Sequence, residues 1–199
     1  MWQKTYRVLL GFMVLAPLGC GRASGDQPGL VQYPFVLTDE ELGLARELAE
    51  MDLPSGALPS GARIVFIKID LLPDRQADTG QRLVMAHHYR YQTDETIFTM
   101  IDLHTREILN REIHAHYPTA LAPMEVEHAI QLARADGSLR PLLDAIPTQF
   151  DARPIQYASS HERLFGHRVV HLLMRQGSNH LVSPRVLVDL TTETVNLEF

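Results

Sequence analysis

The sequence of 199 residues contains a single cysteine, Cys20. No disulfide can form within the chain, so we expect its folded part to be stabilised by packing alone. The sequence also has no cluster of Lys and Arg, because 18 basic side chains are spread among 24 acidic ones and the net charge is −6. Contacts with phosphate groups require a dense basic patch, so we expect no nucleic acid partner.

Several motifs of catalysis and cofactor binding are absent as well. The sequence has no Gly-rich loop of the type that holds phosphates and no paired cysteine motif. The stretch ASSHER (158–163) brings two serines next to a histidine, but no G-x-S-x-G elbow surrounds them. We interpret this stretch as a loop between strands, and we predict no catalytic residue, no cofactor and no enzymatic activity.

A long apolar run is also missing, and the one marked run lies near the N-terminus. VLLGFMVLAPLG (8–19) is too short to span a membrane as a helix, and it follows the positive charges of Lys4 and Arg7. A charged start, an apolar middle and a small residue at the end are typical of an export signal. The residues APLGC at its end resemble the lipobox of bacterial lipoproteins, in which the cysteine carries a lipid.

The lipobox predicts a signal peptide over 1–20, a lipid anchor at Cys20 and a flexible tether over 21–34, where small and polar residues dominate. In proteobacterial lipoproteins, a residue other than Asp at the position of Gly21 implies the outer membrane. We therefore expect an envelope lipoprotein that faces the periplasm or the cell surface. Pro17 stands where the lipobox usually has Leu, and the alternative is a plain secretory signal that yields a secreted or periplasmic protein.

Two similar segments follow, each with the pattern of one helix and four strands. In the first, LTDEELGLARELAE (37–50) has a capping box of Thr38 and Glu41 and apolar residues at helical spacing. In the second, Pro123 suits the first turn of a helix. A short helical piece, LRPLLDAI, follows that helix. The extended runs are ARIVFIKIDLL, QRLVMAHHYRYQ, TIFTMIDL and EILNREIHAHY in the first segment, and FDARPIQYA, RLFGHRVVHLLMR, NHLVSPRVLVDL and TVNLEF in the second.

The two segments can be aligned with each other. Glu41 matches Glu125 at an offset of 84 residues, and Asp102 in MIDLHTREILN matches Asp189 in VLVDLTTETVN at an offset of 87. We infer an internal duplication of an αββββ unit. Because an antiparallel sheet buries one face under its helix, we predict an α+β fold with two four-stranded antiparallel sheets, each packed on one helix, in domains over 35–118 and 119–199.

The order and spacing of these strings resemble the non-catalytic N-terminal region of copper amine oxidases, in particular its second and third domains. LTDEELGLARELAE is similar to the opening helix, ARIVFIKIDLLPD to the first strand, and ERLFGHRVVHLLMRQGSNHLVSPRVLVDLTTETVNLEF to the closing strands of the third domain. The resemblance covers Phe35 to Phe199 and implies two tandem cystatin-like domains. PepSY-type domains end in similar hairpins and are the alternative relationship.

The resemblance stops at the point where the catalytic domain of those oxidases would begin. Their cofactor-forming tyrosine follows an asparagine, and no tyrosine of this chain does. The resemblance therefore implies a module without a quinone cofactor and without amine oxidation. It favours a lipid-anchored, non-catalytic binding or interaction module whose partner is an envelope protein of unknown identity.

Ten histidines are many for 199 residues, so metal binding is the second hypothesis. In the string HAH we expect His114 and His116 to share one face of a strand, about 7 Å apart. With a third ligand the pair could hold Cu or Zn, and the alternative is a polar strand end. The sequence therefore predicts no metal site outright, with His114 and His116 as weak candidates, and a periplasmic Cu- or Zn-binding accessory protein is the alternative function.

Other histidine pairs are less suited to one ion. In MAHHYRY we expect His87 at the edge of the core and His88 on the opposite face of the same strand. His167 and His171 are expected on one strand, about 13 Å apart, which is too far for one ion to bridge.

Overall fold

The structure is a computed structural model that describes residues 36–51, 53, 63–73, 81–145 and 147–198. The predicted signal peptide, the anchor at Cys20 and the tether lie outside these residues. All described residues belong to one compact unit, Tyr33–Phe199. No helix in the described part of the chain is both long enough and apolar enough to cross a membrane.

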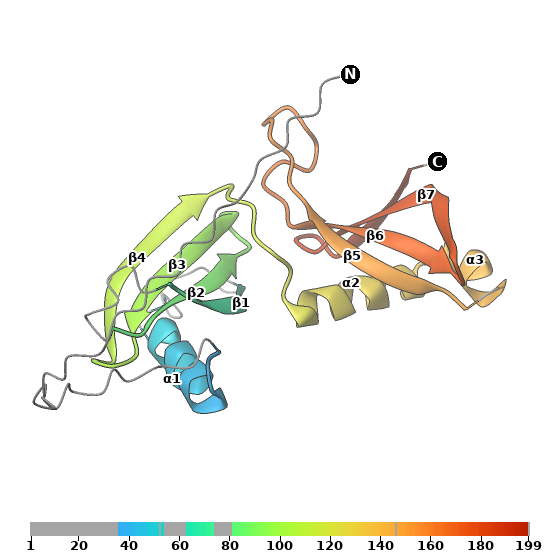
Figure 1. The fold of residues 1–199 in the computed structure, drawn as a ribbon. Coiled ribbons are helices and arrows are strands. Elements are labelled where there is room, and N and C mark those ends of the chain that lie inside the picture. The colour runs from blue at the N-terminus through green and yellow to red at the C-terminus, as the bar shows by residue number, and fades with distance from the viewer. Residues whose placement is uncertain (1–35, 52, 54–62, 74–80, 146, 199) are drawn as a thin grey trace, which may run out of the picture. The chain divides into compact units, whose positions relative to one another are not determined.

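The first half of this unit is one helix and a four-stranded antiparallel sheet of order β1-β2-β3-β4. Figure 1 shows α1 on one face of this sheet. The elements are α1 (Asp39–Glu50), β1 (Ile64–Leu71), β2 (Leu83–Arg90), β3 (Glu95–Asp102) and β4 (Glu107–Ala115).

The second half repeats this order, with one short helix added. Its sheet is antiparallel with the order β5-β6-β7-β8. The elements are α2 (Pro123–Ala135), α3 (Arg140–Ala145), β5 (Gln149–Ile155), β6 (Val169–Gln176), β7 (Asn179–Asp189) and β8 (Thr194–Glu198). The predicted α+β class with two four-stranded antiparallel sheets is therefore confirmed, and α3 matches the short helical piece expected in LRPLLDAI.

The helices form where their capping residues predict. The Thr38 amide donates to Glu41 Oε2 (2.8 Å) and the Glu41 amide donates to Thr38 Oγ1 (3.2 Å), so the expected capping box is present. Helix α1 then buries Ala45 and Ala49 against Val84 and other apolar side chains of the first sheet. Small residues on the buried stripe let the helix approach the sheet closely.

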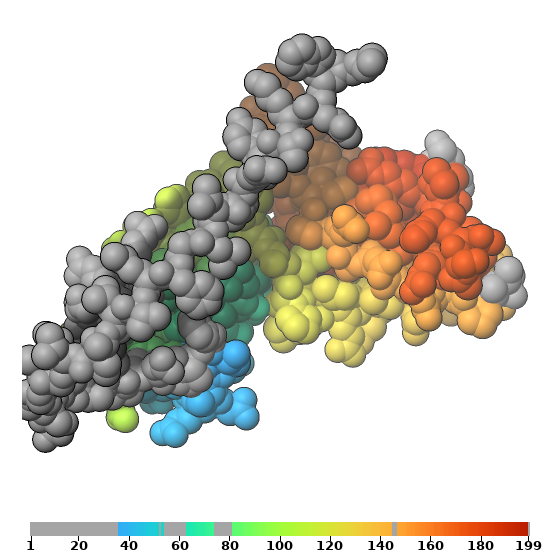
Figure 2. Space-filling view, in the orientation of Figure 1, coloured from blue at the N-terminus to red at the C-terminus, as the bar shows by residue number. Residues whose placement is uncertain are grey.

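The second helix uses Pro123 at its first turn, as expected. It buries Ala129 and Ala133 in a larger core with β6 and β7. That core also includes Tyr89 and Tyr91 from the first half of the chain. The outer surfaces of α1 (blue) and α2 (yellow) are visible in Figure 2.

One predicted strand is too long. The run RLFGHRVVHLLMR was expected to be extended throughout, but β6 begins only at Val169. Gly166 adopts φ 76°, a left-handed conformation that glycine accepts without strain, and the chain turns there. Leu164 packs on Val169 across this turn. His167 therefore lies in a loop and does not share a strand with His171, contrary to expectation.

The hairpins that suggested the duplication have matching turns. Asp102 Oδ1 accepts the amides of His104 (2.8 Å) and Thr105 (3.4 Å). Asp189 Oδ1 accepts the amides of Thr191 and Thr192 in the same way, at 2.9 and 3.3 Å. Each turn then has a residue of positive φ at the same place, Arg106 (59°) and Glu193 (56°). The repeated Asp-Leu-x-Thr string thus encodes one turn geometry used twice.

Candidate binding surface and buried polar clamps

Each half contains an ion pair between a glutamate at the start of its helix and an arginine next to its sheet, Glu41–Arg82 and Glu125–Arg168, which we call the Glu–Arg clamp. In the first clamp, Arg82 is 5% exposed and pairs through its guanidinium with both carboxylate oxygens of Glu41, the third residue of α1. Arg82 Nη2 also donates to the Val36 carbonyl (3.0 Å). The Arg82 hydrogen bonds lower the pKa of the Glu41 carboxyl to about 2. The pair therefore ties the start of α1 to the start of β2.

The second clamp has the same design. Arg168 Nε donates to Glu125 Oε1 (3.1 Å) and its Nη2 to Glu125 Oε2 (2.9 Å), so that it holds the third residue of α2. Arg168 Nη2 also donates to the Ala120 carbonyl (2.5 Å), the counterpart of Val36 in the first clamp. The backbone carbonyls of Arg82 and Arg168 accept from matching leucine amides, Leu103 and Leu190.

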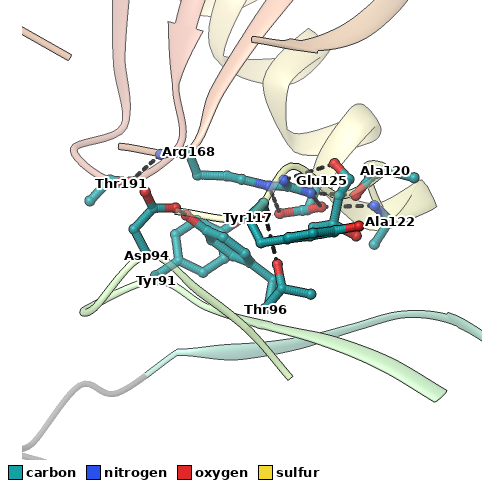
Figure 3. A network of polar contacts seen from close by, with 11 residues as sticks. Tyr91, Asp94, Thr96, Tyr117, Ala120, Ala122, Glu125, Arg168 and Thr191 are labelled. Atoms are coloured by element: carbon teal, nitrogen blue, oxygen red, sulfur yellow. Dashed lines mark hydrogen bonds and ion pairs between the residues drawn. The ribbon is translucent and has the colours of Figure 1, made fainter. Parts of the chain in front are cut away.

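The second clamp is more deeply enclosed than the first. The Glu125 side chain is 1% exposed, whereas that of Glu41 is 23% exposed. Tyr91 donates its hydroxyl to Glu125 Oε1 (2.5 Å), as Figure 3 shows. Glu125 also accepts the Ala122 amide (2.8 Å). Four donated hydrogen bonds thus satisfy a carboxylate that would be costly to bury alone.

A second tyrosine extends this network. The Arg168 guanidinium lies 4.4 Å from the ring centroid of Tyr89, a cation–π contact. Tyr89 donates its hydroxyl to Asp94 Oδ1 (2.6 Å), and Asp94 Oδ2 lies 2.7 Å from His116 Nδ1. Burial first, and then the nearby carboxylates, raise the pKa of both Tyr89 and Tyr91. Both tyrosines therefore stay protonated and act as donors.

The face of the first sheet opposite α1 carries a cluster of rings, which we call the aromatic patch. It consists of Phe98 on β3 with three rings around it, at centroid distances of 4.8 Å to His87, 5.5 Å to His114 and 5.2 Å to Tyr117. The Tyr117 side chain is 47% exposed. Exposed aromatic side chains in contact with one another are typical of protein interfaces, because each offers a large apolar area with a polar edge.

The matching face of the second sheet is different. Arg185 occupies the place of Phe98 at the offset of the two hairpins, and its Nη1 pairs with Glu198 Oε2 at 2.9 Å. The loop before β6 covers part of this face, where Leu164 packs on Val169 and Leu187. On this face the second sheet therefore has an ion pair and a loop that covers part of it, whereas the first sheet has exposed aromatic rings.

The candidate metal ligands His114 and His116 are not paired on one strand face. Strand β4 ends at Ala115, and His116 adopts φ 54°, so the alternation of side chains stops before it. His114 Nε2 lies 3.0 Å from Glu112 Oε2, whereas the His116 ring contacts Asp94 and Phe165. In the described ranges, no group of three or more His, Cys, Asp or Glu side chains is arranged to hold a metal ion.

The adjacent histidines of β2 lie on opposite faces, as expected, but the buried one is His88. It follows Val84 and Ala86 on the face under α1 and is 1% exposed. Neither of its ring nitrogens has a hydrogen-bond partner among the described residues. Burial lowers the pKa of His88 to about 4, so the ring is neutral at pH 7. His87 lies in the aromatic patch, and burial lowers its pKa as well.

Similarity of this chain to known proteins is found among solved structures. A scan against protein-family models and a search of curated proteins both find no match. Among solved structures, the chain is similar to the crystal structure of a copper-containing benzylamine oxidase from Hansenula polymorpha, with a TM-score of 0.48 and 14% sequence identity. The similarity covers 82% of this chain and 29% of the oxidase chain, so this chain spans under a third of that protein.

Proposed function

We propose that this chain is a non-catalytic binding module of the cell envelope that contacts a protein partner through the aromatic patch. The observation that carries the proposal is the contact of three rings with Phe98 on a sheet face opposite the helix. Charge also fits a protein partner, because Lys68 and Asp70 on β1, next to His87 on β2, form an ion pair at 2.6 Å that can serve as a polar rim.

The finer parts of the proposal come from the sequence. We propose an outer-membrane lipoprotein with a lipid on Cys20 and a tether to the folded part. The two αββββ units would be cystatin-like domains over 35–118 and 119–199, related to the second and third N-terminal domains of copper amine oxidases. A lipid anchor would keep the aromatic patch within reach of envelope proteins.

Site-specific photo-crosslinking in cells tests this function. A photoreactive residue replaces Tyr117 in the aromatic patch, and in a matched control it replaces Arg153 on β5 of the second sheet. We expect light-dependent adducts with one envelope protein at position 117 and none at position 153. Equal adducts at both positions, no adduct at either, or only an adduct of two copies of this chain would contradict the proposal.

Metal binding has its own test. Titration of the purified protein with Cu and Zn would support the alternative function if binding were tighter than about 10 μM and were lost in the double variant His114→Ala/His116→Ala. Because His114 and His116 contact different carboxylates, 3.0 and 2.7 Å away, we expect no such binding.

A further inference from the structure

His88 is a buried polar group that the fold does not require. Its counterpart in the second unit is Met174, since the Cα partner of His88 on β1 is Phe66 and that of Met174 on β5 is Phe150. Met174 is 1% exposed and packs in the apolar core. The same fold thus accepts an apolar side chain at this place. A buried imidazole without hydrogen-bond partners lowers the stability of the fold relative to one whose nitrogens are paired.

A cavity adjoins this residue. It has a volume of about 1090 Å³ and is lined by apolar residues of β1 and the start of α2, with Arg46 and Glu50 of α1 at one side and His88 in its wall. Ligand cavities in proteins have roughly 300–1,000 Å³, so the space is sufficient for a small molecule. Phe66 contacts the His88 ring edge-on, with centroids 5.4 Å apart, and also lines the cavity.

The charged side chains around the cavity are already paired. Arg46 Nε lies 2.8 Å from Glu50 Oε1. Arg63 lies 3.8 Å from the ring centroid of Tyr91 and pairs with Glu193 at 3.6 Å. The Glu125 carboxylate, which also lines the cavity, is paired with Arg168 in the second clamp. The cavity therefore has no excess charge to attract an ion, and a neutral ligand suits it best.

We infer that the cavity beside His88 binds a small neutral molecule with an apolar body and a hydroxyl group. A neutral imidazole has one N–H donor and one bare nitrogen acceptor, and a hydroxyl group can accept from the first or donate to the second. Because His88 is buried, a hydrogen bond to its ring gains strength from the low local dielectric. This site is separate from the proposed function, because the aromatic patch lies on the other face of β2.

Binding of 2-naphthol and naphthalene to the purified folded chain tests the inference. The two probes share an apolar body, and only 2-naphthol has a hydroxyl group. We expect 2-naphthol to bind, and His88→Met to weaken it about tenfold, the effect of one hydrogen bond of ~1.4 kcal/mol. The control His171→Met, on β6 of the second sheet, should leave binding unchanged.

Nitrogen NMR of the wild-type protein gives a second readout that does not depend on a variant. We expect 2-naphthol to shift the ring nitrogen signals of His88 and naphthalene to leave them in place. The inference is overturned if 2-naphthol does not bind up to its solubility limit, if His88→Met weakens both probes equally, or if the His88 signals do not respond.

Discussion

The two halves of this chain use one framework for different surfaces. Each half closes its helix onto its sheet with a Glu–Arg clamp and ends its central hairpin with the same Asp turn. The second clamp is covered by Tyr91 and Tyr89, whereas Glu41 in the first remains partly exposed. The first unit instead carries the aromatic patch and the unpaired His88. The second unit thus has the more enclosed clamp, and the first has the surface through which we propose that a partner binds.

The largest expected difference concerns the clamps. Arg168→Met leaves the Glu125 carboxylate buried without its cation, and we expect a loss of about 3–5 kcal/mol in the free energy of unfolding. Arg82→Met should cost about 1–2 kcal/mol, because water can reach Glu41. Urea unfolding of both variants measures the difference. Equal losses would mean that burial does not distinguish the two clamps.

A reciprocal exchange tests the place shared by His88 and Met174. Met174→His puts an unpaired polar ring in a packed core, and we expect it to destabilise the protein by about 2–4 kcal/mol. His88→Met removes such a ring and should stabilise the protein by about 1 kcal/mol. Thermal unfolding of both variants measures the two signs. A loss of stability in His88→Met would show that this histidine has a structural partner.

The pH dependence of stability sharpens the same comparison. The pKa of His88 is about 4 in the folded protein and about 6.5 when unfolded, so the unfolded chain binds the proton more readily. The free energy of unfolding should therefore fall between pH 6.5 and pH 4, by up to about 3 kcal/mol from this group. His88→Met should remove that part of the slope. Parallel curves for wild type and variant would refute the assignment.

The smallest effect is expected at the hairpin turns. Asp189 also accepts from the Thr192 hydroxyl (2.7 Å) and lies 2.6 Å from His167 Nδ1, whereas Asp102 accepts only turn amides within the described part of the chain. Because Asp189 makes two contacts more than Asp102, we expect Asp189→Ala to cost about 2 kcal/mol and Asp102→Ala about 1 kcal/mol. Chemical denaturation with both alanine variants provides the measurement, and the reverse order would contradict the contact pattern.

Local sequence signals predicted the framework well. Thr38 and Glu41 identify the start of α1 because their capping bonds span three residues, and Asp102 and Asp189 identify their hairpins for a similar reason. The strand before Val169 was predicted too long, because one glycine at positive φ is sufficient to turn an apolar run into a loop.

The contacts that join Glu125 to residues distant in the sequence could not be predicted from local sequence patterns. Glu125 was matched to Glu41 as a helix residue, but its partners Arg168 and Tyr91 lie 43 and 34 residues away, and no local pattern indicates them. The alignment of the two segments could have indicated the arginines, because the spacing between Arg82 and Arg168 is close to the offset between the segments. The same alignment places His88 on Met174 and could have marked the buried histidine.

The central claim, that the first sheet binds a partner and the second does not, has one direct measurement. Photo-crosslinking at position 117 in cells is compared between the chain with Phe98 intact and the variant Phe98→Arg, which introduces the residue found at the matching place in the second sheet. We predict that the adduct falls at least tenfold while circular dichroism shows an unchanged fold, since a charge at the centre of the patch opposes apolar contact. An undiminished adduct in the folded variant would contradict the account.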